Sequence, residues 1–215
     1  MLRPTGAATL RATCGALADG GDWLACGDGG ELRVLAWNVV REAGGVNDPE
    51  AFDTELYDLT EVAAAPSPSG AAIACLAARG TKIAVGYSLH AVAVYALADG
   101  ALTLIAMELA RSRAPRCVAW LGSGVEARLV VGEASGAAVL ALTPTLKRVL
   151  RRAPEPPASE VKEEDSEKPP PASDLVRVLV DCGVVETATE VCAVVALGDD
   201  VALVGESGEV GGVGG

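Results

Sequence analysis

Four segments of this chain repeat one pattern, and this repeat constrains the fold more than any other feature. Each segment has an apolar strand, a turn, a small apolar strand that ends in glycine, a second turn and a third strand. The segments are residues 12–38, 73–97, 117–142 and 191–215. Their aligned glycines are Gly27, Gly86, Gly132 and Gly205. These glycines stand 59, 46 and 73 residues apart, and the last gap falls to about 52 without an acidic insertion, which is close to the period of a β-propeller blade.

The residues around these glycines favour strands over helices. Short apolar runs are bounded by Gly, Asp, Asn and Pro, as at residues 32–37, 82–85, 91–95 and 127–131. Residues 102–114 are the best candidate for a helix, and the sequence leaves that choice open. One unit cannot cover both of its own faces, so the units have to stack. We therefore predict an all-β fold, an incomplete β-propeller of about four WD40-like, four-stranded blades.

One segment differs from the rest in composition. Residues 153–173 hold six of the twelve prolines and six acids against two lysines. Such a stretch buries too little apolar surface to offset the entropy of ordering it, so we predict a disordered, acidic, Pro-rich loop. The predicted domains are propeller blades over residues 1–152, this loop over 153–173, and a further blade over 174–215 that is truncated at its C-terminus.

Composition disfavours several classes of protein. Lys and Arg number 17 against 29 Asp and Glu, for a net charge of -12, so nucleic-acid binding over the whole surface is unfavourable. The longest uncharged run, residues 62–78, is interrupted by Pro, Ser and Gly and does not predict a membrane span. The six cysteines form no CxxC pair, which disfavours a zinc site and favours buried, reduced thiols in an intracellular protein.

No catalytic constellation is apparent in the sequence. The single histidine, His90, lies in a predicted turn and has no nucleophile motif around it. Acids such as Asp28 lie in glycine-rich turns, where solvated side chains are the default. Residues 27–30 lack the lysine of a phosphate loop, and a hairpin turn explains them. We therefore predict a protein that is not an enzyme and that uses no cofactor, metal ion or small-molecule substrate.

Two basic clusters stand out against the acidic background and are the candidate contacts for nucleic acid or a partner protein. The first cluster is Arg111, Arg113 and Arg116. The second is Lys147, Arg148, Arg151 and Arg152. Local positive charge of this kind can contact a phosphate backbone. Aromatic stacking platforms are missing nearby, so recognition of single strands is poorly supported, and a solvated or protein-facing patch is the alternative.

The repeats resemble a known family more closely than they resemble WD40 proteins, whose GlyHis and TrpAsp dipeptides are missing here. The residues that carry the resemblance are GDWLACGDGGELRVLAW (21–37), GTKIAVGYSLHAVAVYAL (80–97), ARLVVGEASGAAVLAL (127–142) and DDVALVGESGEVGGV (199–213). They are similar to blades of the cleavage and polyadenylation specificity factor A-subunit family. Its members include large subunits of the damaged-DNA-binding complex, the polyadenylation factor and splicing factor 3b. Family members carry Asp after the blade glycine, where this chain has Glu133.

The resemblance implies a function as well as a fold. It implies a non-enzymatic scaffold of a nuclear complex for pre-mRNA 3′-end processing, splicing or DNA-damage recognition. The partners would be protein subunits, with RNA or DNA contacted through the complex, and no membrane. Family proteins have three propellers and a helical C-terminal region, so this chain is interpreted as a fragment. The alternatives are an intracellular propeller adaptor in trafficking or ubiquitin ligation, nuclear or cytoplasmic, and a propeller hydrolase with carboxylates around the axis.

Overall fold

The computed structural model describes eight stretches of the chain: residues 12–18, 20–42, 54–109, 111–122, 128–150, 173–187, 189–197 and 200–213. These stretches form fifteen strands and no helix, so the predicted all-β class is confirmed. Residues 102–114, where the sequence left a helix open, contribute β8 (Ala101–Leu109). No segment of the described chain is a helix that could span a membrane. The predicted acidic loop lies outside the described residues except for Ser173, which begins a strand.

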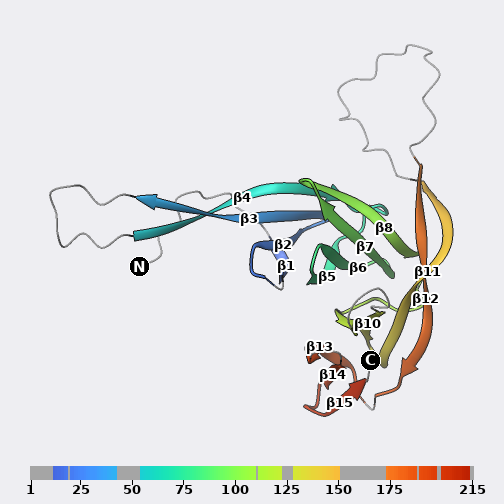
Figure 1. Cartoon of the computed structure of the whole chain (residues 1–215). Coiled ribbons are helices and arrows are strands. Elements are labelled where there is room, and N and C mark those ends of the chain that lie inside the picture. The colour runs from blue at the N-terminus through green and yellow to red at the C-terminus, as the bar shows by residue number, and fades with distance from the viewer. Residues whose placement is uncertain are drawn as a thin grey trace, which may run out of the picture.

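The strands group into four antiparallel units in chain order (Figure 1). Unit 1 is β1 (Ala12–Leu17), β2 (Trp23–Asp28), β3 (Glu31–Glu42) and β4 (Thr54–Pro66). Unit 2 is β5 (Ile73–Arg79), β6 (Lys82–Tyr87), β7 (Ala91–Ala98) and β8. Unit 3 is β9 (Cys117–Leu121), β10 (Arg128–Glu133), β11 (Gly136–Leu150) and β12 (Ser173–Val185). Unit 4 is β13 (Val191–Leu197), β14 (Asp200–Gly205) and β15 (Val210–Val213).

Unit 2 and unit 3 join edge to edge into one eight-stranded sheet. The junction is a short parallel pairing of β8 with β12, in which Ala106 is opposite Arg177 and Met107 is opposite Val178. All other strand pairs are antiparallel and join strands that are neighbours in sequence. The local topology is therefore a meander repeated along the chain.

The repeat extends to the irregularities of the strands. In units 1, 2 and 3 the fourth strand has one extra residue opposite the same position of the third strand. The extra residues, which have no register partner, are Val62, Ile105 and Cys182. Such a β-bulge bends a strand and increases its local twist. A bulge at an equivalent position in three units indicates that they share one backbone geometry, beyond a shared hydrophobic pattern.

The core lies between the units. Three apolar clusters fill the contacts of unit 1 with unit 2, unit 2 with unit 3, and unit 3 with unit 4. Their members are mostly Val, Ala and Leu, as the low aromatic content predicts. The first strands of the units are also neighbours, since β1 contacts β5, β5 contacts β9 and β9 contacts β13. The units therefore pack face to face in chain order.

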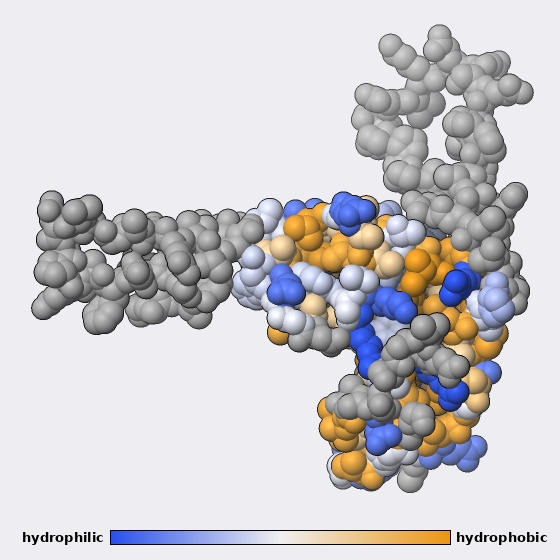
Figure 2. Space-filling model, viewed as in Figure 1, coloured by the Kyte–Doolittle hydropathy of each residue, from blue (hydrophilic) through white to orange (hydrophobic). Residues whose placement is uncertain are grey.

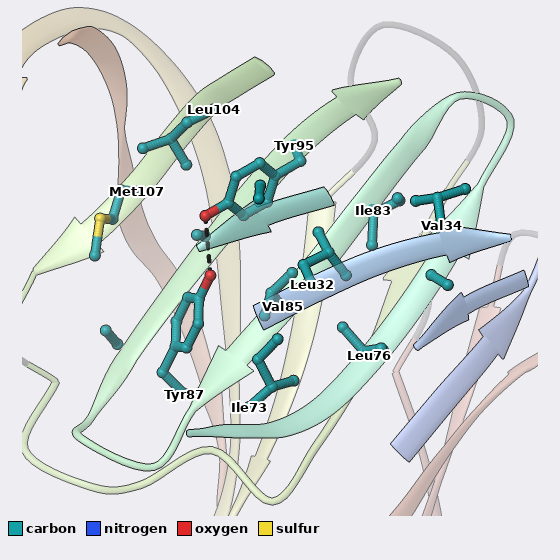
Figure 3. Packing of buried hydrophobic residues seen from close by; sticks show 14 of the residues in the cluster. Leu32, Val34, Ile73, Leu76, Ile83, Val85, Tyr87, Tyr95, Leu104 and Met107 are labelled. Atoms are coloured by element: carbon teal, nitrogen blue, oxygen red, sulfur yellow. Dashed lines mark hydrogen bonds between the residues drawn. The ribbon is translucent and has the colours of Figure 1, made fainter. Parts of the chain in front are cut away.

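A buried tyrosine pair sits in the contact between unit 1 and unit 2 (Figure 3). The hydroxyl groups of Tyr87 and Tyr95 are hydrogen-bonded at 3.0 Å, and Leu104 and Met107 lie nearby in the same cluster. Burial, together with the neighbouring Tyr95, raises the pKa of Tyr87 well above its ordinary value. The pairing satisfies polar groups that would be costly to bury alone.

Candidate functional site

Three of the four aligned glycines occupy one equivalent position near the end of the second strand. Gly27 and Gly86 are the register partners of Cys14 and Cys75 in the first strands of units 1 and 2. A Cβ atom on Gly27 would lie 2.8 Å from Cys14 Sγ and 2.8 Å from Cγ2 of Ile73, which begins unit 2. The glycine therefore admits both a thiol of its own unit and a side chain of the next.

The same arrangement recurs at the two later contacts between units. On Gly86 the added Cβ would meet Cys75 Sγ at 2.5 Å and Pro115 Cβ at 3.0 Å. On Gly132 it would meet Cys117 Sγ and, at 2.8 Å, Cγ1 of Val191, which begins unit 4. Real Cβ atoms do not approach other atoms this closely. These positions require glycine because of steric contact.

Gly205 departs from this arrangement. It is opposite Val191, the first residue of its unit, in the way that Tyr87 is opposite Ile73 in unit 2. Its nearest atoms come from Thr189 and Glu209 of its own unit, and Val204 takes the place that glycine holds in the other units. The sequence alignment of Gly205 with the other three glycines is thus out of register by one residue.

Of the thiols beside the glycines, Cys75 is buried and Cys14 and Cys117 are half-buried, and all three are poorly acidic. Burial raises the pKa of Cys75 to about 12 and that of Cys117 to about 11, and it also raises the pKa of Cys14. A thiol of this kind is a poor nucleophile at neutral pH because little thiolate is present. All six cysteines are free, and Cys182 and Cys192 are exposed.

Arg111, from the first predicted basic cluster, is buried. Its Nε atom donates to Glu133 Oε1 at 2.8 Å, its Nη1 atom lies 2.5 Å from Glu108 Oε2, and Asp181 Oδ1 is 3.6 Å away. Glu108 belongs to unit 2, whereas Glu133 and Asp181 belong to unit 3. The guanidinium therefore links two units and leaves little of its charge for a partner.

Burial and neighbouring charges shift the pKa values of this ion cluster in opposite directions. Burial raises the pKa of Glu108, against the opposing effect of Arg111. For Arg111, burial acts to lower the pKa, but Glu108 and Glu133 outweigh it, so the net change is upward. The arginine is consequently charged at every physiological pH.

The other basic candidates are distributed differently. Arg113 is exposed and donates to Ser135, and Arg116 is exposed and pairs with Glu190. Lys147 and Arg148 lie on β11, where their register partners are Val176 and Leu175. Arg151 and Arg152 lie outside the described residues. Of the seven predicted contacts, Arg113 and Arg116 are therefore the ones described at the surface.

The structure places the single histidine in a turn, whereas Asp28 is the last residue of β2. His90 is exposed in the turn between β6 and β7 with a φ of 57°, and its carbonyl accepts the backbone N–H of Arg111 at 2.8 Å. Within the described ranges, no group of three His, Cys, Asp or Glu side chains is arranged to hold a metal ion.

Sequence reasoning missed an ion cluster on unit 1. Arg33 donates to Glu61 at 3.0 Å and to Glu31 at 2.6 Å, and its Nε atom lies 3.6 Å from Asp28. Glu31 and Arg33 alternate along β3, so a shared face could be inferred from the sequence. Glu61 joins them only through the pairing of β3 with β4, across 28 positions of the chain.

Comparison with known proteins adds a likeness of fold. No family model matches the chain, and no curated protein matches it. Its structure is similar to the crystal structure of the computationally designed Ika4 protein, with a TM-score of 0.52 and 12% identity, over 99% of this chain and 95% of that chain. Together these findings define an all-β protein built from consecutive antiparallel units.

Proposed function

We propose that the four units are consecutive blades of a β-propeller. The observation that carries this proposal is the recurring contact at Gly27, Gly86 and Gly132, where the first strand of one unit meets the start of the next unit. Face-to-face packing and neighbouring first strands are what blades around a common axis require.

The function supported best is that of a non-enzymatic scaffold in a larger protein complex. Its support is the repeated, apolar, strand-built architecture together with the resemblance of four segments to the cleavage and polyadenylation specificity factor A-subunit family. Under this proposal the protein acts in the nucleus, in 3′-end processing of pre-mRNA, splicing or DNA-damage recognition. Nucleic acid is contacted through the complex, with Arg113 and Arg116 as the best exposed basic residues.

Affinity purification of the tagged chain tests the scaffold function. Polyadenylation, splicing or damage-recognition subunits should co-purify in stoichiometric amounts. Trafficking or ubiquitin-ligase subunits in their place would favour the adaptor alternative and overturn the nuclear role.

Nucleic-acid contact is tested separately with the same complex. An Arg113→Ala/Arg116→Ala variant should bind RNA or DNA more weakly and with a lower salt dependence. With fewer phosphate contacts, fewer counterions are released when the protein binds. Glu206→Gln, a change in an exposed turn residue of unit 4, is the matched control. Equal affinity and salt dependence in all three proteins would remove the two arginines from the interface.

A further inference from the structure

In the described part of the chain, one face of the unit 1 sheet lies outside the three apolar clusters between units. In unit 2 the equivalent face packs against unit 1 and presents Tyr87, Ala91 and Ala93, which are 0%, 4% and 0% exposed. Strand register assigns their counterparts in unit 1, because Asp28 pairs with Glu31 as Tyr87 pairs with Ala91, and Arg33 stands where Ala93 stands. A buried apolar contact in unit 2 thus corresponds to an ion cluster in unit 1. We call this side of β1–β4 the outer face.

The outer face combines charge with exposed apolar groups. Side-chain alternation and strand pairing place three large apolar side chains beside the ion cluster. They are Leu17, Trp37 and Leu59, which are 56%, 40% and 38% exposed. The three carboxylates remain accessible as well, since the side chains of Asp28, Glu31 and Glu61 are 27%, 39% and 44% exposed. A surface that combines exposed apolar and charged side chains in this way is typical of protein interfaces.

Unit 3 provides an example of a group that acids at these positions bind. Glu133 holds the position of Asp28, and Asp181 holds the position of Glu61, as the equivalent strand pairings show. Both acids are paired with Arg111, which comes from the segment between β8 and β9 that packs onto unit 3. In unit 3, therefore, acids at these two positions accept a guanidinium from a segment outside the unit.

Unit 1 has acids at the same positions, and the described residues outside this unit place no guanidinium on them. Its own Arg33 offers one positive charge to the three carboxylates of Asp28, Glu31 and Glu61. The excess negative charge is best matched by a second cation, and a planar guanidinium suits carboxylates because it can bond two of them at once.

Unit 4 of a second copy of this chain fits the outer face poorly. The open face of unit 4 exposes Val195, Leu197 and Val210, and orange surface is visible on that lower lobe in Figure 2. Residues 189–213 contain no Lys or Arg, so docking of unit 4 would leave the acids unmatched. Burying unpaired carboxylates against valine and leucine is unfavourable.

We propose that the outer face of unit 1 docks an arginine-bearing segment of a partner protein. The arginine lies among Asp28, Glu31 and Glu61 as Arg111 lies between Glu133 and Asp181, and an adjacent apolar side chain packs on Trp37 and Leu59. This interface extends the proposed scaffold function by naming a docking surface and the chemistry of its partner, but it does not depend on the nuclear role.

Selection from a displayed library of random 12-residue peptides on the full chain tests the proposal. Enriched peptides should carry arginine next to an aliphatic or aromatic residue. Their affinity should fall at least about tenfold for Asp28→Asn/Glu61→Gln, the usual scale for losing a charge-assisted hydrogen bond, and should weaken with added salt. Trp37→Ala should weaken binding too, whereas Glu206→Gln on unit 4 should not.

Three results would overturn the proposal. One is enrichment of peptides without basic residues, and another is equal binding to the double variant and the unmodified chain. If the double variant does not fold, as judged by its circular dichroism, Glu31→Gln takes its place with the same expectation. The third is peptide binding only after deletion of residues 2–10, because this result would mean that the chain's own N-terminal segment occupies the outer face. Co-purification from cells reads out the scaffold function separately from these peptides.

Discussion

Gly86 stands at a point where the backbone of unit 2 meets both its own first strand and the lead into unit 3. Cys75 Sγ and Pro115 leave no room for a methyl group there. The need for glycine at this position could be predicted from the repeat, because glycine recurs after the second strand. The neighbouring atoms could not be predicted, since Pro115 is brought near by packing of one unit on another.

Gly86→Ala should lower the free energy of unfolding by about 1–3 kcal/mol, the usual cost of overpacking a close contact. Gly211→Ala is the matched control, because a Cβ atom there meets no other atom within 4 Å. Urea unfolding followed by circular dichroism measures both. Equal stability of the two variants would show that the contact at Gly86 relaxes freely.

Arg111→Met should lower stability by about 3–5 kcal/mol, because it leaves Glu133 buried without its cation. Arg113→Met removes an exposed arginine two residues away and should change stability by no more than about 0.5 kcal/mol. The sequence presented these arginines as equivalent members of one basic cluster. Their difference arises from the fold, which places Glu108 and Glu133 around the first. A similar loss in both variants would contradict that difference.

Alkaline pH should destabilise the protein through the thiols of Cys75 and Cys117, of which the first is buried and the second half-buried. Cys75 and Cys117 have folded-state pKa values of about 12 and about 11, both raised from 9.0, so the folded protein holds these protons more tightly than the unfolded chain. Their contribution is fully present below pH 9 and is lost as the pH rises toward 11–12, by about 1.4 kcal/mol per pH unit for each thiol. Urea unfolding between pH 8 and about 11 measures this slope. A Cys75→Ala/Cys117→Ala variant should show a shallower one, and an unchanged slope would contradict the assignment.

At the scale of elements, short strands and their turns were predictable from alternating apolar residues and from Gly and Asp punctuation. The tight turn after β7 illustrates this, since Asp99 and Gly100 both have positive φ, at 49° and 72°. The parallel pairing of β8 with β12 was not predictable, because Ala106 and Arg177 are 71 positions apart. The register of Gly205 was also missed, because one residue more or less in a hairpin leaves the local sequence pattern unchanged.

Substitutions on the exposed face of unit 4 should affect self-association more than stability. Val195 and Val210 are 46% and 71% exposed, so Val195→Lys/Val210→Lys should leave the free energy of unfolding within about 0.5 kcal/mol of the unmodified chain and reduce self-association. Light scattering at increasing protein concentration measures the association. In contrast, Val85→Lys places a charge in the core between units 1 and 2 and should prevent folding. Undiminished association of the double variant would show that another surface is responsible.

At the scale of the whole molecule, the chain is a row of related units of antiparallel strands. Unit 1 and unit 4 are at the ends of this row, and Figure 1 shows the long hairpin β3–β4 extending away from the units. The repeat in the sequence predicted strands in all four segments, and the structure has strands in each of them. What each end face binds could not be predicted, since it depends on which side chains the sheet pairing collects, such as Arg33 with Glu61.

A crystal structure of the chain within its native complex tests the central claim most directly, which is that the units are successive blades of a propeller. We expect β1, β5, β9 and β13 to be the innermost strands around one axis, with Gly27, Gly86 and Gly132 each against a cysteine of its own unit and the start of the next. A structure in which these first strands are apart, or in which the units share no common axis, would contradict it.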